Sequence, residues 1–128
     1  MKKIIHTSEA PSAIGTYNQA VQIGGFIYTS GQLGIDPQVG DLVQGGIGKE
    51  TLRALQNIHI ILKEAGVDKS NMLKLTVFIT DLEGFKHVND SFKIFFQGVE
   101  YPARSTVEVS ALPMGAKVEI ECVAFIGE

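Results

Sequence analysis

The spacing of apolar residues changes repeatedly along the chain, and this alternation constrains the fold more than any other feature. From Ile47 to Ala65 apolar residues recur every three or four positions, the period of an amphipathic helix, and Gly66 follows where a helix C-terminal cap is expected. Between Leu73 and Thr80 the period becomes two, which is that of a strand. A second helical stripe runs from Phe85 to Phe96.

Strand patterns flank these helices. Residues 18–33 are typical of a hairpin in which Gly24-Gly25 supplies the positive φ of a tight turn. Residues 106–109 and 118–124 return to period two, and residues 3–5 offer a short additional strand. The order strand, strand, helix, strand, helix, strand, strand predicts an α+β fold, in which a sheet carries two helices on one face.

The length of 128 residues fits a single domain, residues 1–128, and the 45% apolar content is enough for one packed core. Two helices can cover only one side of the predicted sheet, yet the other side also carries apolar residues. These are Phe78, Val107 or Val109, Val123 and Phe125. Exposure to water costs roughly 25 cal/mol per Å² of apolar surface, so we expect a homo-oligomer that buries this face.

Charge, cysteine content and hydropathy limit the partners and the cellular location that we expect for this chain. The 14 acidic and 11 basic residues are interspersed and give a net charge of −3, so no basic patch for nucleic acid is predicted. Cys122 is the lone cysteine, which excludes an intramolecular disulfide and favours a reducing, cytoplasmic environment. No apolar run approaches the roughly 20 residues of a membrane-spanning helix, and no signal peptide pattern is present, so we expect neither membrane insertion nor export.

Two further sequence features give little support for a binding site. Gly45–Thr51 superficially resembles a phosphate-binding loop, but Val43 and Glu50 stand where that motif needs glycine and a hydroxyl residue. Helix entry explains the segment equally well. The three histidines lie far apart, without metal-ligand spacing: His6, His59 and His87. The sequence therefore predicts no nucleotide site and no metal site.

Arg104 has the strongest case for binding chemistry. It follows Pro102 and precedes a strongly patterned strand, so its guanidinium projects from a rigid sheet edge. A planar fork of donors suits a carboxylate, which makes an anion clamp one interpretation and a surface or interface salt bridge the other. Glu119 and Glu121 share a face of the last strand, where a carboxylate could activate water or serve as an ordinary polar residue.

Two segments, Tyr101–Val109 and Ala111–Glu121, resemble the signature of the Rid family of reactive imine deaminases, also called YjgF-like proteins. Ala13–Tyr17 and Thr29–Leu33 match this family further upstream, so the resemblance covers nearly the whole chain; single matching residues are Asn57, Val88 and Asn89. The resemblance implies a chorismate-mutase-like α+β fold and a homotrimer with active sites between neighbouring subunits. It also implies hydrolysis of 2-imino acids, such as 2-iminobutanoate and 2-iminopropanoate, to 2-keto acids and ammonia without a cofactor.

The resemblance also implies roles for individual residues. Arg104 would bind the carboxylate of the imino acid, and Glu119 would position or deprotonate the attacking water. Tyr17 and Ser30 match pocket residues of the family, one of them at the imine end and from a neighbouring subunit.

Further pocket positions follow from the same resemblance. Gly31 and the backbone of Thr106 would complete the cradle around the substrate, and Asn89 matches a supporting position. The chain departs from the family pattern at Thr16, where proline is common, at Thr106, where many bacterial members have cysteine, and at Glu50, where glutamine is frequent. These departures leave the arginine and the glutamate in place, and we expect them to affect substrate preference.

Two other functions compete with imine hydrolysis. A non-catalytic regulatory module of the same fold could bind a keto acid or another small carboxylate through Arg104 without turnover. Older labels of the family also imply a single-strand endoribonuclease or a translation inhibitor. An RNA-binding groove is usually basic and rich in stacking aromatic residues, whereas this chain is acidic and lacks tryptophan, which argues against the ribonuclease.

Overall fold

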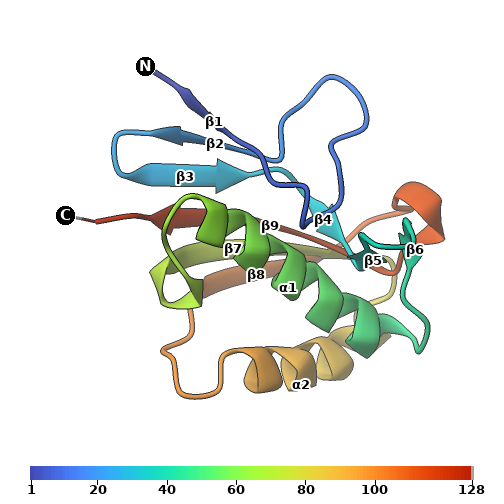
Figure 1. Ribbon diagram of the computed structural model, residues 1–128. Helices are drawn as coiled ribbons and strands as arrows, with labels where there is room; N and C mark the ends of the chain where they lie inside the picture. Colours follow the sequence, from blue (N-terminus) through green and yellow to red (C-terminus); the bar gives the residue numbers. More distant parts are fainter. Residues whose placement is uncertain (128) are drawn as a thin grey trace.

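The alternating apolar periods form two α-helices and a seven-stranded sheet in the computed structural model, which describes residues 1–127 (Figure 1). The helices are α1 (Ile47–Glu64) and α2 (Phe85–Phe95). The large sheet contains β1 (Lys3–Ile5), β2 (Ala20–Ile23), β3 (Phe26–Thr29), β4 (Gln32–Leu33), β7 (Met72–Ile79), β8 (Ala103–Glu108) and β9 (Val118–Phe125). A separate two-stranded ribbon is formed by β5 (Ile35–Asp36) and β6 (Asp41–Leu42). The described residues also form three short 3-10 helices, η1 (Lys69–Asn71), η2 (Leu82–Gly84) and η3 (Pro113–Gly115).

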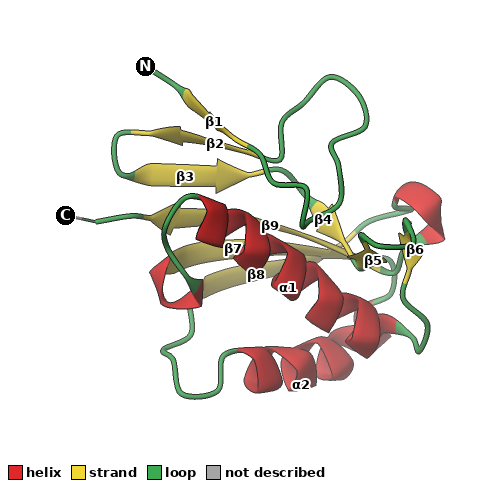
Figure 2. Cartoon of the chain, viewed as in Figure 1, coloured by secondary structure: helices red, strands yellow, loops and turns green. Residues whose placement is uncertain are grey.

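The sheet has the strand order β1-β2-β3-β9-β7-β8, with β4 paired to β9 off this path. All pairs are antiparallel except β7 and β8, which are parallel because α2 returns the chain between them (Figure 2). The predicted α+β architecture and the strand at residues 3–5 are confirmed. The short strands β4, β5 and β6 were not predicted, since two residues are too few to establish a period.

The β2–β3 hairpin turns at Gly24 and Gly25, but the two glycines are needed for different reasons. Gly24 has a φ of 56°, as predicted for a tight turn. The prediction of positive φ at Gly25 is wrong: its backbone is ordinary, but a Cβ atom there would lie 2.5 Å from the Phe125 ring. Glycine at this second position therefore lets the end of β9 pack against the hairpin.

Helix α1 ends as its sequence predicts. Gly66 has a φ of 89°, and its N–H donates to the carbonyl of Lys63 at 3.0 Å. The N–H of Val67 donates to the carbonyl of Leu62 at 3.1 Å. This pair of bonds is a Schellman motif, which satisfies carbonyl groups that the helix end would otherwise leave unpaired.

Strand β7 departs from the simple alternation that the sequence suggests. Its register against β9 shifts between Met72 and Lys74, so the residue between them, Leu73, is left out of the pairing. As a result Met72 is buried and Leu73 is exposed, although an unbroken period of two would place Leu73 on the same face as the buried Leu75. This β-bulge restores the alternation for Leu75 and the residues that follow.

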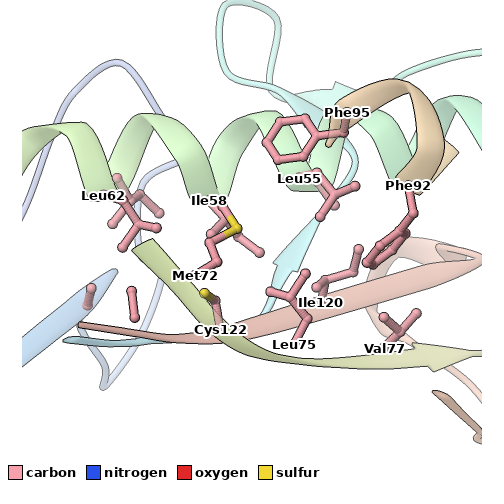
Figure 3. Packing of buried hydrophobic residues seen from close by; sticks show 14 of the residues in the cluster. Leu55, Ile58, Leu62, Met72, Leu75, Val77, Phe92, Phe95, Ile120 and Cys122 are labelled. Atoms are coloured by element: carbon pink, nitrogen blue, oxygen red, sulfur yellow. The ribbon is translucent and has the colours of Figure 1, made fainter. Parts of the chain in front are cut away.

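The hydrophobic core lies between the helices and one face of the sheet (Figure 3). Helix α1 contributes Leu55, Ile58 and Leu62, which face Leu75 of β7 and Ile120 of β9 in Figure 3. Cys122 lies in the same layer, and burial raises the pKa of its thiol to about 12, so it is an unreactive core residue.

The opposite face of the sheet carries apolar side chains that the chain leaves open to solvent. Phe26 and Tyr28 of β3 and Val107 of β8 are exposed there, and Phe78 and Val123 lie between them partly covered. Register partners point to the same face, so these apolar side chains share one face of the sheet, with polar residues of β7 and β9 between them. The prediction that the second face also carries apolar residues is confirmed.

Candidate active site

Five of the seven residues to which the resemblance gives a role line two separate cavities, whereas Ser30 and Thr106 line neither of them. Arg104 and Asn89 line one cavity, beside α2. Tyr17, Gly31 and Glu119 line the other, beside the loop that precedes β2. Each cavity thus contains part of the predicted set.

The first cavity is built around Arg104, whose strand β8 forms an edge of the sheet. Arg104 pairs with Leu75, a core residue, so its side chain points toward the helices. There its guanidinium lies over two rings of α2, with the Cζ atom 5.3 Å from the centroid of Phe85 and 4.8 Å from that of Phe92. The cavity measures about 400 Å³ and is lined by Asn89, Phe92, Lys93, Tyr101, Pro102 and Arg104.

The surroundings of Arg104 favour the anion clamp over the salt bridge. Burial lowers the pKa of the guanidinium, and no neighbouring carboxylate within residues 1–127 counteracts that shift. The other arginine, Arg53, differs because its Nε donates to Oδ1 of Asn57 at 3.1 Å on its own helix. Arg104 therefore keeps an uncompensated charge beside an open cavity.

Thr106 lies two residues beyond Arg104 and on the same face of β8, opposite Val77. Its Oγ1 is buried and has no hydrogen-bond partner among residues 1–127. Because β8 has a neighbouring strand on one side only, part of its backbone is unpaired and can bind another molecule.

The second cavity contains the candidate base Glu119. This residue lies on β9 opposite Phe78, and its side chain points to the open face of the sheet. Burial raises the pKa of the Glu119 carboxyl, and the nearby charge of Glu121 raises it further. The cavity measures about 290 Å³, and its walls are largely apolar, including Ile14, Leu33 and Met114.

Gly31 lies directly against the carboxylate of Glu119. A Cβ atom at Gly31 would lie 2.1 Å from Oε2 and 2.8 Å from Cδ of Glu119, so only glycine leaves this carboxylate in place. The preceding residue, Ser30, donates its hydroxyl to the carbonyl of Asn18 at 2.5 Å. At the cavity wall, the hydroxyl of Tyr17 accepts the N–H of Ile14 at 3.4 Å.

Two buried amides hold the walls of this cavity. Gln19 accepts the N–H of Thr7 at 2.8 Å and donates to the carbonyl of Pro11 at 2.8 Å, which fixes the loop before β2. Asn57 of α1 donates to the carbonyls of Leu33 at 3.2 Å and Ile35 at 2.9 Å. Asn57 figures in the family resemblance, but Gln19 was missed because an isolated glutamine gives no sequence signal of burial.

Sequence reasoning also missed the aromatic residues that contact Arg104. The periodicity places Phe85 and Phe92 on one apolar stripe of the second helix. Phe92 is buried, whereas Phe85 is 40% exposed and its ring lies near the guanidinium. Met114 was not singled out either, yet it lines the Glu119 cavity and is the one non-glycine residue within 1–127 with positive φ, at 61°.

Arg104 and Glu119 do not meet within one chain. Their strands are separated by β7, and Arg104 pairs with Leu75 while Glu119 pairs with Phe78, three residues further along. Leu75 and Phe78 point to opposite faces of the sheet, and so do their partners. The side chains of Arg104 and Glu119 therefore lie on opposite faces of the sheet.

Residues 1–127 contain neither a membrane-spanning helix nor a cluster of metal-binding side chains. Neither helix has the combination of length and apolar character that crossing a bilayer requires. No group of three or more histidine, cysteine, aspartate or glutamate side chains is arranged to hold a metal ion in this part of the chain.

Comparisons with known proteins give consistent matches over nearly the whole chain. The family model described as Endoribonuclease L-PSP matches residues 7–126. The 2-iminobutanoate/2-iminopropanoate deaminase of Mus musculus is 49% identical over 127 residues, which are 99% of this chain and 93% of that protein. The protein of the same name from Bos taurus is 50% identical, covering 99% of this chain and 92% of its own length.

Solved structures also match closely. YyfA from Yersinia pestis, described as a member of the conserved Rid protein family, has a TM-score of 0.94 at 50% identity, covering 98% of this chain and 99% of that one. Escherichia coli TdcF, crystallised with bound serine, has a TM-score of 0.92 at 41% identity, covering 96% and 98% of the two chains.

Proposed function

Because the chain belongs to the Rid (YjgF-like) family, whose family model is described as Endoribonuclease L-PSP, we propose that it hydrolyses 2-iminobutanoate and 2-iminopropanoate to 2-keto acids and ammonia. In this proposal residues 1–128 form one catalytic domain and work in the cytoplasm, where the lone Cys122 stays reduced. The similarity to mammalian proteins named for this reaction supports it over nearly the full length of the chain.

The observation that carries the proposal is that Arg104 and Glu119, whose charges are opposite, line two separate cavities, each of which supplies half of a site. Arg104 supplies a partly buried cation without an acidic partner among residues 1–127, and Glu119 supplies a partly buried carboxylate on the opposite face. We infer that the sites form between copies of the chain, with Arg104 from one subunit and the Tyr17, Gly31 and Glu119 cavity from its neighbour. Association through the open apolar face would bring them together, and we propose a homotrimer.

Arg104 would hold the substrate in one orientation. Its guanidinium can donate two parallel hydrogen bonds to the carboxylate of a 2-imino acid. Asn89 lines the same cavity and would support the carboxylate, while the backbone of Thr106 at the sheet edge would hold the substrate from the side. The serine bound to E. coli TdcF is also a small carboxylate.

Glu119 would activate the water that attacks. With a protonated imine, its carboxylate takes one proton as the water oxygen bonds to the imine carbon and the C=N electron pair moves to nitrogen, which gives a neutral tetrahedral amino alcohol. Return of that proton to nitrogen makes ammonia the leaving group. As the C–N bond breaks and the C=O bond forms, the hydroxyl group gives its proton to the Glu119 carboxylate, which is free again. Either Tyr17, which lines the cavity, or Ser30, which precedes Gly31, would contact the imine end, and Gly31 keeps space for the Glu119 carboxylate. An imine is already electrophilic, so orientation and one base are sufficient chemistry.

A carboxylate-binding regulatory module remains the main alternative. It would use Arg104 in the same way but would not need Glu119 as a base. A single-strand endoribonuclease, which the family description suggests, is a weaker alternative because the chain has a net charge of −3 and no tryptophan.

A coupled assay distinguishes these three functions. Purified protein is added while 2-iminobutanoate is generated from threonine by a dehydratase, and the rates of ammonia and 2-oxobutanoate release are followed. Faster release than in buffer supports the deaminase, whereas product binding without acceleration supports the regulatory module. Degradation of single-stranded RNA that depends on Arg104 or Glu119 would support the ribonuclease. Light scattering on the same preparation should give three times the mass of the chain, and a monomer would contradict the shared site.

A further inference from the structure

The guanidinium of Arg104 lies over two aromatic rings, and no acidic side chain among residues 1–127 lies beside it. We propose that Phe85 and Phe92 are positioning residues, which hold the guanidinium by cation–π contact and leave its N–H groups free for the substrate carboxylate. This inference rests on the proposed function, because it assigns the rings to the alignment of the same carboxylate.

Both rings come from one face of α2. Phe85 and Phe92 are seven residues apart, which is close to two helical turns, so they follow one another along the surface that faces β8. The Cζ atom of Arg104 lies 5.3 Å from the centroid of the Phe85 ring and 4.8 Å from that of the Phe92 ring. Both distances are within the range of about 6 Å for cation–π attraction.

Aromatic rings suit this task better than a carboxylate would. An aspartate or glutamate partner would accept the same N–H groups that a substrate carboxylate needs, and the substrate would have to displace it. A ring instead interacts with the face of the planar guanidinium and leaves its edge available. The two rings therefore restrict the orientation of Arg104 without reducing its capacity as a donor.

The two phenylalanines differ in a way that makes the inference testable. Phe92 is 5% exposed and belongs to the hydrophobic core, so its replacement would disturb packing as well. Phe85 is 40% exposed at the start of α2, so Phe85→Leu removes the ring with little loss of core packing. Phe85→Tyr restores the ring. Phe95→Leu is a stringent control for loss of a ring, because Phe95 is a more deeply buried ring on the same helix that contacts His59 and Lys69 instead of Arg104.

The experiment combines kinetics with NMR spectroscopy of the arginine side chains. In Phe85→Leu we expect kcat/KM for 2-iminobutanoate to fall about threefold to thirtyfold, mainly through a higher KM, since cation–π contacts contribute in that range. Phe85→Tyr should recover most of this loss, and Phe95→Leu should keep wild-type kinetics. The chain has two arginines, so the Nε–H signals of Arg53 and Arg104 can be told apart. Loss of the ring current should move the Arg104 signal in Phe85→Leu and leave that of Arg53 unchanged.

Several results would overturn the inference. One is an unchanged Arg104 signal in Phe85→Leu, and another is a shifted signal with an unchanged KM. A loss that Phe85→Tyr does not recover would show that packing, and not the ring face, is responsible. If the wild-type protein does not hydrolyse imines, the proposed function fails separately, and titration with 2-oxobutanoate then tests the rings. Weaker 2-oxobutanoate binding in Phe85→Leu but not in Phe95→Leu would still support them, and equal binding would refute them.

Discussion

The two cavities differ in how each holds its charged group. On the helix side of the sheet, Arg104 is held by the rings of Phe85 and Phe92. On the open side, the Glu119 carboxylate fits against Gly31, and the surrounding loops are fixed by hydrogen bonds from Gln19 and Asn57. The Arg104 cavity is thus shaped by side-chain packing, and the Glu119 cavity by backbone and buried amides.

The contrast also shows what each cavity lacks. Burial lowers the pKa of Arg104 and raises the pKa of Glu119, so each group is shifted toward its neutral form. A desolvated charge is costly unless an opposite charge or hydrogen-bond partner is near. Each cavity contains the charge that would compensate the other, which is the physical basis for proposing that they meet between subunits.

Glu119→Gln should separate binding from chemistry and has the largest expected effect. The amide keeps the size of the side chain and its fit against Gly31 but removes the basic oxygen. We expect kcat to fall by roughly 10² to 10⁴ while 2-oxobutanoate still binds at the Arg104 cavity. Steady-state kinetics and a binding titration check both parts. Unchanged turnover would reduce Glu119 to a structural residue.

Arg104→Lys should affect the other cavity, with a smaller loss. Lysine keeps the positive charge but cannot form two parallel bonds to a carboxylate or stack as a planar group on Phe85 and Phe92. We expect kcat/KM to fall roughly tenfold to a hundredfold, through both KM and kcat, with oligomeric mass unchanged. Near-wild-type activity combined with a lower melting temperature would indicate a structural salt bridge instead.

Gly31→Ala tests whether the Glu119 cavity is shaped by backbone contact. The new methyl group would displace the carboxylate, whose flexible side chain can move without unfolding the protein. We expect kcat to fall roughly tenfold to a hundredfold, since small errors in position have effects of this order. Gly48→Ala is the control: its Cβ would meet Ser91 Oγ at 3.6 Å, an ordinary contact between residues that line neither cavity. Equal activity of both variants would show that the carboxylate position is not critical.

Glu121→Gln should give the smallest effect, a shift in pH dependence. The charge of Glu121 raises the pKa of Glu119, so its removal lowers that pKa. A base acts in its deprotonated form, and the acid limb of kcat/KM should therefore move to lower pH while the plateau rate is kept. Glu64→Gln, at the end of α1, should leave the profile unchanged. A shift to higher pH, or the same shift in both variants, would contradict the role of Glu119 as the base.

Local patterns predicted much of the fold because they depend on neighbouring residues. Helix α1 and its Gly66 cap, and the turn at Gly24, follow from spacing and backbone preference alone. The bulge that exposes Leu73 depends on the register of β7 against β9, a strand about fifty residues away in sequence. No local pattern contains that information.

The same reasoning explains what the sequence could predict of the site. Arg104 and Glu119 stand out by residue type and by family resemblance, and both line cavities. Their location on opposite faces could not be predicted, because it depends on how two distant strands pair with β7. The spacing of Phe85 and Phe92 was a usable signal, but an aromatic stripe on a helix is ordinarily a core feature.

Subunit mixing tests the proposed site between chains most directly. Arg104→Lys and Glu119→Gln are each prepared alone, then unfolded and refolded together in equal amounts. If each site takes Arg104 from one chain and Glu119 from another, random assembly restores both groups in about a quarter of the sites, whatever the number of subunits in the ring. The account predicts recovery of about a quarter of wild-type kcat per chain. A mixture no more active than the two variants refolded separately would contradict it.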